Sequence, residues 1–391
     1  MMRSNVADVA TDSASFNRSS ASGVLRNNRD RVSKTVISRE SLMTKAEEAP
    51  PCEVPAREGN RNLLKKLALT IFALLFTASL LEAALRIVFY HSMDFSMEMW
   101  KYAVRLKRPV SNPKMSFAHQ PNSHSFLMGT DVSINSQGLR DREYSLEKPS
   151  DVYRILLLGD STTLGWGVPL KETAAKILER ELNAQNIPGY RRFEAINAGV
   201  GNYDTVQEVT YYETRGRDFH PDLVILVYFI NDPEPVPIEK RGFLLDRSYL
   251  VAFLTNRFDG VLRRLGARPD WKTYYASLYD DNLPGFQACK GALQDLALAT
   301  RNDHARLLVA LLPELHQIND HYPFTAAHQK IKDVLAPAQV PVLDLIDGLR
   351  NHGPESTLWV TPLDDHPNGK ANALIAAQLR GWIVSQLAGN H

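Results

Sequence analysis

The sequence predicts an α/β protein, with a three-layer α/β/α domain built on a five-stranded, mostly parallel sheet and preceded by one N-terminal transmembrane helix. From about residue 151 onward, short apolar runs alternate with stretches of helical periodicity, which is typical of βαβ units with right-handed crossovers. A longer apolar run without charges stands before this region, at 67–81. With 391 residues and 44% hydrophobic side chains, the chain can bury a sizeable core.

Five apolar runs supply the predicted strands, at 155–158, 193–198, 223–229, 307–312 and 340–345. The first is apolar at every position, which suits a strand that is buried on both faces. Helices are expected at about 172–186 and at 204–217, since apolar residues recur there at roughly helical spacing. Parallel sheets carry their chemistry at the carboxyl ends of the strands, so the turns after these strands are the places to look for a site.

The N-terminal part predicts a membrane anchor. Residues 1–62 are rich in Ser, Asn, Asp and Arg, without sustained periodicity, and are expected to form a disordered cytoplasmic region. Residues 63–90 are expected to be a transmembrane signal anchor, in which Glu82 and Arg86 can pair near the far interface. Four cations flank its start, and they favour a cytoplasmic N-terminus with the rest of the chain periplasmic or extracellular: Arg57, Arg61, Lys65 and Lys66.

A cleaved signal peptide and a buried core helix are the alternatives for this apolar run. A signal peptide normally follows a short basic leader, whereas this run follows some 60 residues and lacks a clear Ala-x-Ala site. A start at Met43 would shorten the leader and favour cleavage.

Residues 91–150 are expected to form a lead-in segment packed on the catalytic domain at 151–391. Arg140, in this segment, is expected to make a structural ion pair rather than to contact a substrate. An insertion at about 233–284 is too long for a simple connection and is a candidate lid or specificity element. Its aromatic residues could stack on sugars or an acyl chain, although such spacing more often packs a local helix: Trp271, Tyr274, Tyr275 and Tyr279.

Composition argues against several classes of protein. The net charge is +1 and no basic face for nucleic acid is expected. The two cysteines, Cys52 and Cys289, stand on opposite sides of the expected membrane segment, so we expect no disulfide between them. The spacing of His316, His321 and His328 does not place them on one helix face and no Cys is near, so no metal site is expected.

Two short motifs can carry nucleophilic chemistry. Ser161 follows an apolar run and a Gly159-Asp160 turn, which would place its hydroxyl on a strand-to-helix corner. Asp160 is then expected to hold the corner by local hydrogen bonds. Near the C-terminus, Asp364 precedes His366 by two residues and could orient its imidazole as a base for Ser161. Each motif alone is as well explained by a capped helix.

Together with two further motifs, these residues resemble the SGNH, or GDSL-type, superfamily of esterases and acyl hydrolases. The four blocks occur in the order found in that superfamily, within roughly residues 150–390: Gly159-Asp160-Ser161-Thr162, Asn197-Ala198-Gly199-Val200-Gly201, Ile230-Asn231-Asp232 and Asp364-Asp365-His366-Pro367-Asn368. The resemblance implies a flavodoxin-like fold that needs no cofactor.

The same resemblance assigns roles to individual residues. It makes Ser161 the nucleophile, His366 the general base and Asp364 the acid that orients it. It implies an oxyanion hole formed by the N–H groups of Ser161 and Gly201 and by the side-chain amide of Asn231.

The chain departs from the family pattern at two positions. Phe229 stands where a small residue is common and would either narrow the cleft or point into the core. The acid often precedes the His by three residues, where this chain has Leu363. Asp365 therefore remains an alternative to Asp364.

The resemblance and the anchor favour a serine esterase that removes acyl groups, with acetyl as one candidate, from an envelope glycan or lipid. Transfer of the acyl group to a sugar hydroxyl, as in a polysaccharide O-acetyltransferase, would use the same residues. A non-catalytic envelope scaffold or glycan-binding protein that keeps the fold is the alternative outside enzymes.

Overall fold

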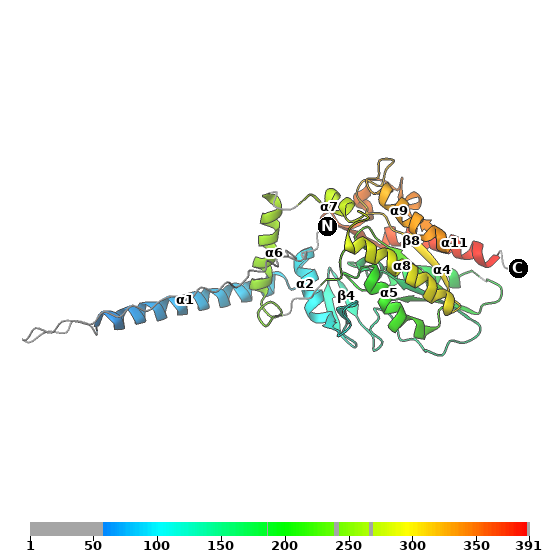
Figure 1. Cartoon of the computed structure of the whole chain (residues 1–391). Helices are drawn as coiled ribbons and strands as arrows, with labels where there is room; N and C mark the ends of the chain where they lie inside the picture. Colours follow the sequence, from blue (N-terminus) through cyan, green and yellow to red (C-terminus); the bar gives the residue numbers. More distant parts are fainter. Residues whose placement is uncertain (1–57, 186, 238–241, 266–268, 389–391) are drawn as a thin grey trace, which may run out of the picture. The chain divides into compact units, whose positions relative to one another are not determined.

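The computed structural model describes residues 58–185, 187–237, 242–265 and 269–388 (Figure 1). Most of the predicted cytoplasmic region 1–62 lies outside the described residues. The chain divides into two compact units at residues 77 and 78, within helix α1 (Glu58–Val88). Within the stretch Arg61–Val88 of this helix, an 18-residue window reaches a mean hydropathy of 2.0, and the stretch is long and apolar enough to cross a membrane.

The centre of the larger unit is a five-stranded sheet in the order β6-β5-β7-β8-β9, and every neighbouring pair is parallel. This confirms the predicted sheet, and the order is that of doubly wound, flavodoxin-like folds. Its strands are β5 (Val152–Leu158), β6 (Arg192–Asn197), β7 (Leu223–Tyr228), β8 (Arg306–Leu311) and β9 (Val342–Asp344). Each residue of β5 and β7 is buried, as expected for central strands that are almost entirely apolar. The exception in β5 is Arg154, which pairs with Glu194 at 2.8 Å.

Helices cover both faces of the sheet and complete the predicted three layers. Helix α4 (Ala174–Asn183) packs against α11 (Gly369–Ala388), and α5 (Thr205–Thr214) packs against α8 (Pro284–Asn302), which also contacts α9 (Thr325–Leu335) (Figure 1). The apolar positions that predicted α4 are its buried face: Ala175, Ile177, Leu178 and Leu182. The helix is shorter than expected at both ends, and Thr173 caps its start.

The lead-in segment folds as helix α2 (Phe95–Leu106) and two antiparallel hairpins. The hairpins pair β1 (Lys107–Pro109) with β2 (Phe117–His119), and β3 (His124–Leu127) with β4 (Thr130–Ser133). Tyr102 and Leu106 of α2 share a buried cluster with Leu164 and Trp166. The lead-in segment therefore packs directly on the loop that follows Ser161.

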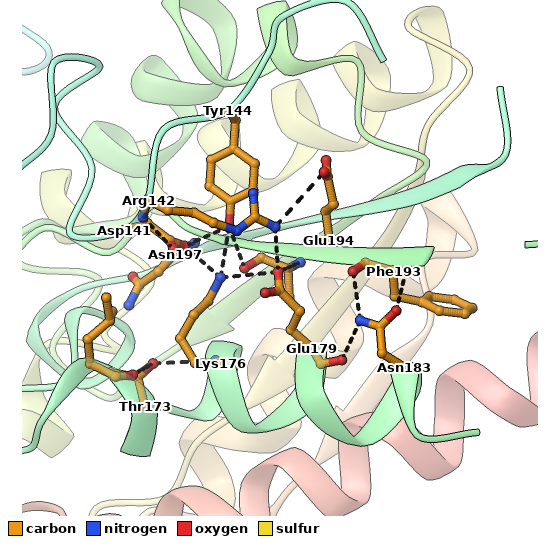
Figure 2. A network of polar contacts seen from close by, with 12 residues as sticks. Asp141, Arg142, Tyr144, Thr173, Lys176, Glu179, Asn183, Phe193, Glu194 and Asn197 are labelled. Atoms are coloured by element: carbon orange, nitrogen blue, oxygen red, sulfur yellow. Dashed lines mark hydrogen bonds and ion pairs between the residues drawn. The ribbon is translucent and has the colours of Figure 1, made fainter. Parts of the chain in front are cut away.

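A polar network joins the end of the lead-in segment to the edge strand β6 and to α4 (Figure 2). The Asn183 side chain exchanges two hydrogen bonds with the backbone of Phe193, at 2.9 Å each. Carboxylates of Glu179 and Asp141 accept from the N–H groups of Ala195 and Asn197, at 2.8 and 2.9 Å. These side chains occupy backbone groups that an edge strand would otherwise expose to another chain.

The insertion contains α6 (Tyr249–Arg264) and α7 (Trp271–Ser277). Tyr275 of α7 packs into the main core, while α6 packs on α2 and on the end of α1 through a separate buried cluster, with Phe89, Met97, Tyr249 and Ala252 as its members. The remaining short elements are α3 (Ser161–Leu164), α10 (Ile346–Leu349), β10 (Trp359–Thr361) and β11 (Asp364–Pro367).

Candidate active site

Ser161 lies on a sharp corner between β5 and α3. Gly159 allows this corner, because a Cβ there would lie 2.1 Å from Thr163 Oγ1. The Asp160 carboxylate accepts hydrogen bonds from the N–H and the hydroxyl of Thr162, both at 2.8 Å, and so holds the turn as expected. Ser161 is the first residue of α3, and an N–H at that position has no acceptor within its helix.

The structure brings Ser161, His366 and Asp364 together from positions 205 residues apart. Ser161 Oγ lies 2.9 Å from His366 Nε2, and His366 Nδ1 lies 2.6 Å from Asp364 Oδ1. Because an ionised carboxylate only accepts, Nδ1 carries the proton and Nε2 is left to accept from the serine hydroxyl. This is the arrangement that activates a serine as a nucleophile.

Asp364 is held by a second bond from the loop after Ser161. Trp166 Nε1 donates to Asp364 Oδ2 at 3.1 Å. That loop is fixed in turn by Arg140, a buried residue that donates to the carbonyls of Leu164, Gly165 and Val168 at 3.0, 2.5 and 2.7 Å. Arg140 is structural, as predicted, but its partners here are backbone carbonyls instead of the expected carboxylate.

Asp365, the alternative acid, has different partners. Its Oδ2 lies 3.4 Å from His316 Nδ1, and the same nitrogen bonds Glu314 Oε1. Burial raises the pKa of Glu314 to about 8, and hydrogen bonds with Asp365 and Glu314 raise the pKa of His316 to about 9. Asp365 is thereby engaged with His316, and Asp364 is the acid at hydrogen-bond distance from His366.

The electrostatics of the triad follow from its burial and its internal charges. Burial is the largest single effect on the pKa of His366 and lowers it, but the charge and hydrogen bond of Asp364, together with the charges of Asp365 and Asp160, raise it above 6.5 overall. Burial raises the pKa of Asp364, and its charge interaction and hydrogen bonds with His366 lower it overall. The pair therefore stabilises the imidazolium that forms when His366 takes a proton.

The three expected oxyanion donors have different surroundings. Asn231, just beyond β7, lines it, and its buried Oδ1 has no partner among the described residues. Gly201 is not among the described residues that line the cavity, and its N–H donates to Tyr102 Oη at 2.9 Å. The next residue, Asn202, does line it. The role of the Gly201 N–H in an oxyanion hole stays a prediction.

Tyr102 connects this loop to a buried histidine. Its hydroxyl lies 2.7 Å from His119 Nε2, and His119 Nδ1 lies 2.9 Å from the carbonyl of Gly138. The carbonyl can only accept, so Nδ1 carries the proton and Nε2 accepts from Tyr102. Burial lowers the pKa of His119 to about 4, which keeps this neutral form at physiological pH. The hydrogen bonds therefore all run in one direction: the Gly201 N–H donates to the Tyr102 hydroxyl, which in turn donates to His119 Nε2.

A cavity of about 510 Å³, including open solvent at its mouth, opens beside Ser161 and His366. Its walls are mainly apolar and come from α2, the end of β7, α7 and the loop after β8: Phe95, Met99, Phe229, Tyr275, Leu312, Pro313 and Leu315. The Phe95 ring also packs on the His366 ring, with centroids 5.7 Å apart. Sequence reasoning missed Phe95, Met99 and Trp166, since apolar residues carry no signal of which distant loop they cover.

Three side chains beside the cavity could offer ligands to a cation. Single ligand atoms of Glu314, His316 and Asp365 all lie within 4.8 Å of one another. A divalent ion there would have to displace the protons that these groups now share.

No family model and no curated protein matches the chain. Several solved structures do. One is TesA, with 14% sequence identity and a TM-score of 0.37, and the match covers 59% of this chain and 97% of that chain. Another was described as a lipolytic protein of the G-D-S-L family from Desulfitobacterium hafniense, with 11% identity and a TM-score of 0.37, and the match covers 58% of this chain and 98% of that chain. A two-domain esterase active on acetylated mannans also matches (16% identity, 61% of this chain and 50% of that chain, TM-score 0.40), so the chain spans about half the length of that protein.

Proposed function

We propose that this protein is a serine esterase of the SGNH type that cleaves acyl esters through a covalent intermediate on Ser161. The observation that carries the proposal is the hydrogen-bonded series Ser161–His366–Asp364 at the edge of a cavity. Ser161 Oγ attacks the ester carbonyl carbon while His366 Nε2 takes the hydroxyl proton. When the tetrahedral intermediate collapses, His366 returns that proton to the leaving alcohol.

The Ser161 N–H and the Asn231 side-chain amide are the proposed oxyanion donors, because both belong to residues that line the cavity. Such donors stabilise charge that develops only in the transition state, and loss of one typically costs about 10²–10³ in rate. The loop 199–202 faces the cavity through Asn202, whose Oδ1 accepts from the buried Lys107 at 3.0 Å. This contact supports a fixed loop beside the reacting carbonyl.

The substrate is proposed to be an ester on an envelope glycan or lipid, reached by a domain that α1 anchors to the membrane. The apolar walls fit an acyl group, and the apolar length of α1 supports the anchor. Hydrolysis and acyl transfer to a sugar hydroxyl use the same residues up to the acyl-enzyme. Product analysis with an acetyl donor and a glycan acceptor separates them, and transfer is wrong if water takes the acyl group at every acceptor concentration.

The esterase proposal is tested with the full chain in detergent micelles or nanodiscs. Turnover of an aryl acetate and labelling by a fluorophosphonate should both be lost in Ser161→Ala. Ser385→Ala is the matched control, because Ser385 bonds only locally to the carbonyl of Trp382 on α11. Equal turnover by Ser161→Ala and the native chain would overturn the proposal, and absence of labelling in the native chain would favour a non-catalytic scaffold.

A further inference from the structure

Helix α6 carries an exposed apolar face. Four residues at helical spacing form it, and we call them the α6 face: Leu254, Phe258, Val261 and Leu265, which are 56%, 65%, 49% and 75% exposed. Phe243 and Leu244, in the loop before the helix, are 73% and 63% exposed. Soluble proteins rarely leave large apolar side chains in a contiguous row, so such a face marks an interaction surface.

The opposite side of α6 is fixed to the protein. Tyr249 and Ala252 are buried against Phe89 and Met97. Arg105 of α2 donates to Tyr249 Oη at 2.8 Å, and Arg257 pairs with Asp94 at 2.9 Å. The α6 face is therefore presented by a helix that is held in place, rather than by a loosely attached segment.

The start of α6 is bonded to the last turns of α1. The Glu82 carboxylate accepts from the N–H groups of Tyr249 and Leu250, at 3.0 and 2.9 Å, and from the hydroxyl of Ser248 at 2.8 Å. Arg86 donates to the carbonyl of Arg247 at 2.8 Å. Glu82 thus caps α6, and the helix that is long enough to span a membrane supplies the cap.

These contacts fix where α6 lies if α1 is in a bilayer. About 20 apolar residues cross a hydrocarbon core of about 30 Å, so a span that starts near Arg61 is complete near residue 80. Glu82 and Arg86 then stand at the interface, which suits their charges. Since α6 is bonded to both, it begins at the same level.

We propose that α6 lies on the membrane, with the α6 face inserted among the lipids of the leaflet from which the α1 helix emerges. The proposal rests on the proposed anchoring by α1. The other side of α6 is already packed on α2 and on the end of α1, which leaves the α6 face to insert at the interface, where an apolar helix face is stabilised by burial. A second copy of the chain is the other possible occupant.

The test uses the full-length chain in nanodiscs of phosphatidylcholine and phosphatidylglycerol. In a Cys52→Ser background, with Cys289 buried, single cysteines are introduced by Leu254→Cys, Leu74→Cys and Leu298→Cys and labelled with an environment-sensitive fluorophore. Leu298 on α8 is the matched control, because it is 57% exposed against 56% for Leu254. Thermal unfolding verifies that each variant is folded.

Lipids with spin-labelled acyl chains should quench the labels at 74 and 254 several-fold more than the label at 298. If the lipids quench the label at 74 but quench the labels at 254 and 298 equally, the proposal for α6 is wrong and the membrane anchoring by α1 is supported. No quenching at 74 would overturn both. Excimers between copies labelled with pyrene at 254, without lipid quenching, would assign the α6 face to a dimer instead. Because no label lies among the residues that line the cavity, these results are independent of whether Ser161 is catalytic.

Discussion

The hydroxyl of Tyr102 accepts a hydrogen bond from the backbone N–H of Gly201 at 2.9 Å. This contact links the lead-in segment to the loop beside the nucleophile. Tyr102→Phe should leave the buried Gly201 N–H without its acceptor, at a cost of about 1–3 kcal/mol in the free energy of unfolding. It should also lower kcat more than it changes KM, because the loop supports the transition state more than substrate binding. Urea unfolding and steady-state kinetics measure the two effects.

Tyr211→Phe provides the control for this prediction. The Tyr211 hydroxyl is buried and has no hydrogen-bond partner among the described residues, so its removal should cost little stability. If both variants lose the same stability and keep the same kcat, Tyr102 does not position the loop.

The two neighbouring carboxylates should differ in their effect on catalysis. Asp364→Asn should lower kcat/KM by about 10⁴, since an amide cannot hold His366 in the required tautomer and charge state. Asp365→Asn should have a much smaller effect on kcat/KM and should act mainly on stability, because Asp365 is engaged with His316. Kinetics of both variants with an aryl acetate decide the assignment, and a larger loss in Asp365→Asn would reverse it.

The activity should depend on pH through His366. The imidazole must be neutral to accept the serine proton, so kcat/KM should fall as the pH drops through its pKa, which lies above 6.5. In Asp364→Asn the largest of the effects that raise this pKa is gone, while burial, which lowers it, remains. The acid limb of the pH profile should therefore move to lower pH. An unmoved limb would mean that another group controls it.

Much of the fold and part of the site were predictable from the sequence. The motif residues lie at the carboxyl ends of parallel strands or on the adjoining β11, so recognising the strands before Ser161 and Asn231 was enough to expect them at one edge. The short bonds of His366 to Ser161 and Asp364 agree with the roles that the resemblance implied.

The parts of the site that the sequence did not predict depend on where backbone N–H groups point and on contacts between residues far apart in the chain. A glycine at 201 indicates only that space is short there. In the structure, the space is taken by the Tyr102 ring, whose Cε1 would lie 2.7 Å from a Cβ at Gly201. Tyr102 stands 99 residues earlier, and neither periodicity nor motif spacing connects α2 with this loop. The same holds for Phe95, whose ring packs on His366.

Stability should also depend on pH through Asp232. Burial, and then the nearby charge of Asp160, raises the pKa of Asp232 well above its usual value of 3.8. Above pH 3.8 the folded state therefore binds more protons than the unfolded state, and stability falls as the pH rises, by at most about 1.4 kcal/mol per pH unit. Asp232→Asn, which mimics the neutral acid, should flatten this decline. Urea unfolding of both proteins between pH 4 and 8 measures how stability declines with pH. Asp320→Asn is the control, because the Asp320 side chain is 94% exposed.

Phe229 should limit the length of the acyl group. It follows β7 directly and lines the cavity two residues before Asn231, so its ring takes space that a longer acyl chain would need. Phe229→Ala should raise the ratio of kcat/KM for an aryl butyrate to that for an aryl acetate by roughly tenfold, since two buried methylenes are worth about 0.8 kcal/mol each. Phe243→Ala makes the same change at a side chain that is 73% exposed and outside the cavity lining, and it should leave the ratio unchanged. A ratio that stays constant in Phe229→Ala, in a protein that unfolds normally on heating, would show that the acyl chain lies along another wall, against Met99 or Leu315.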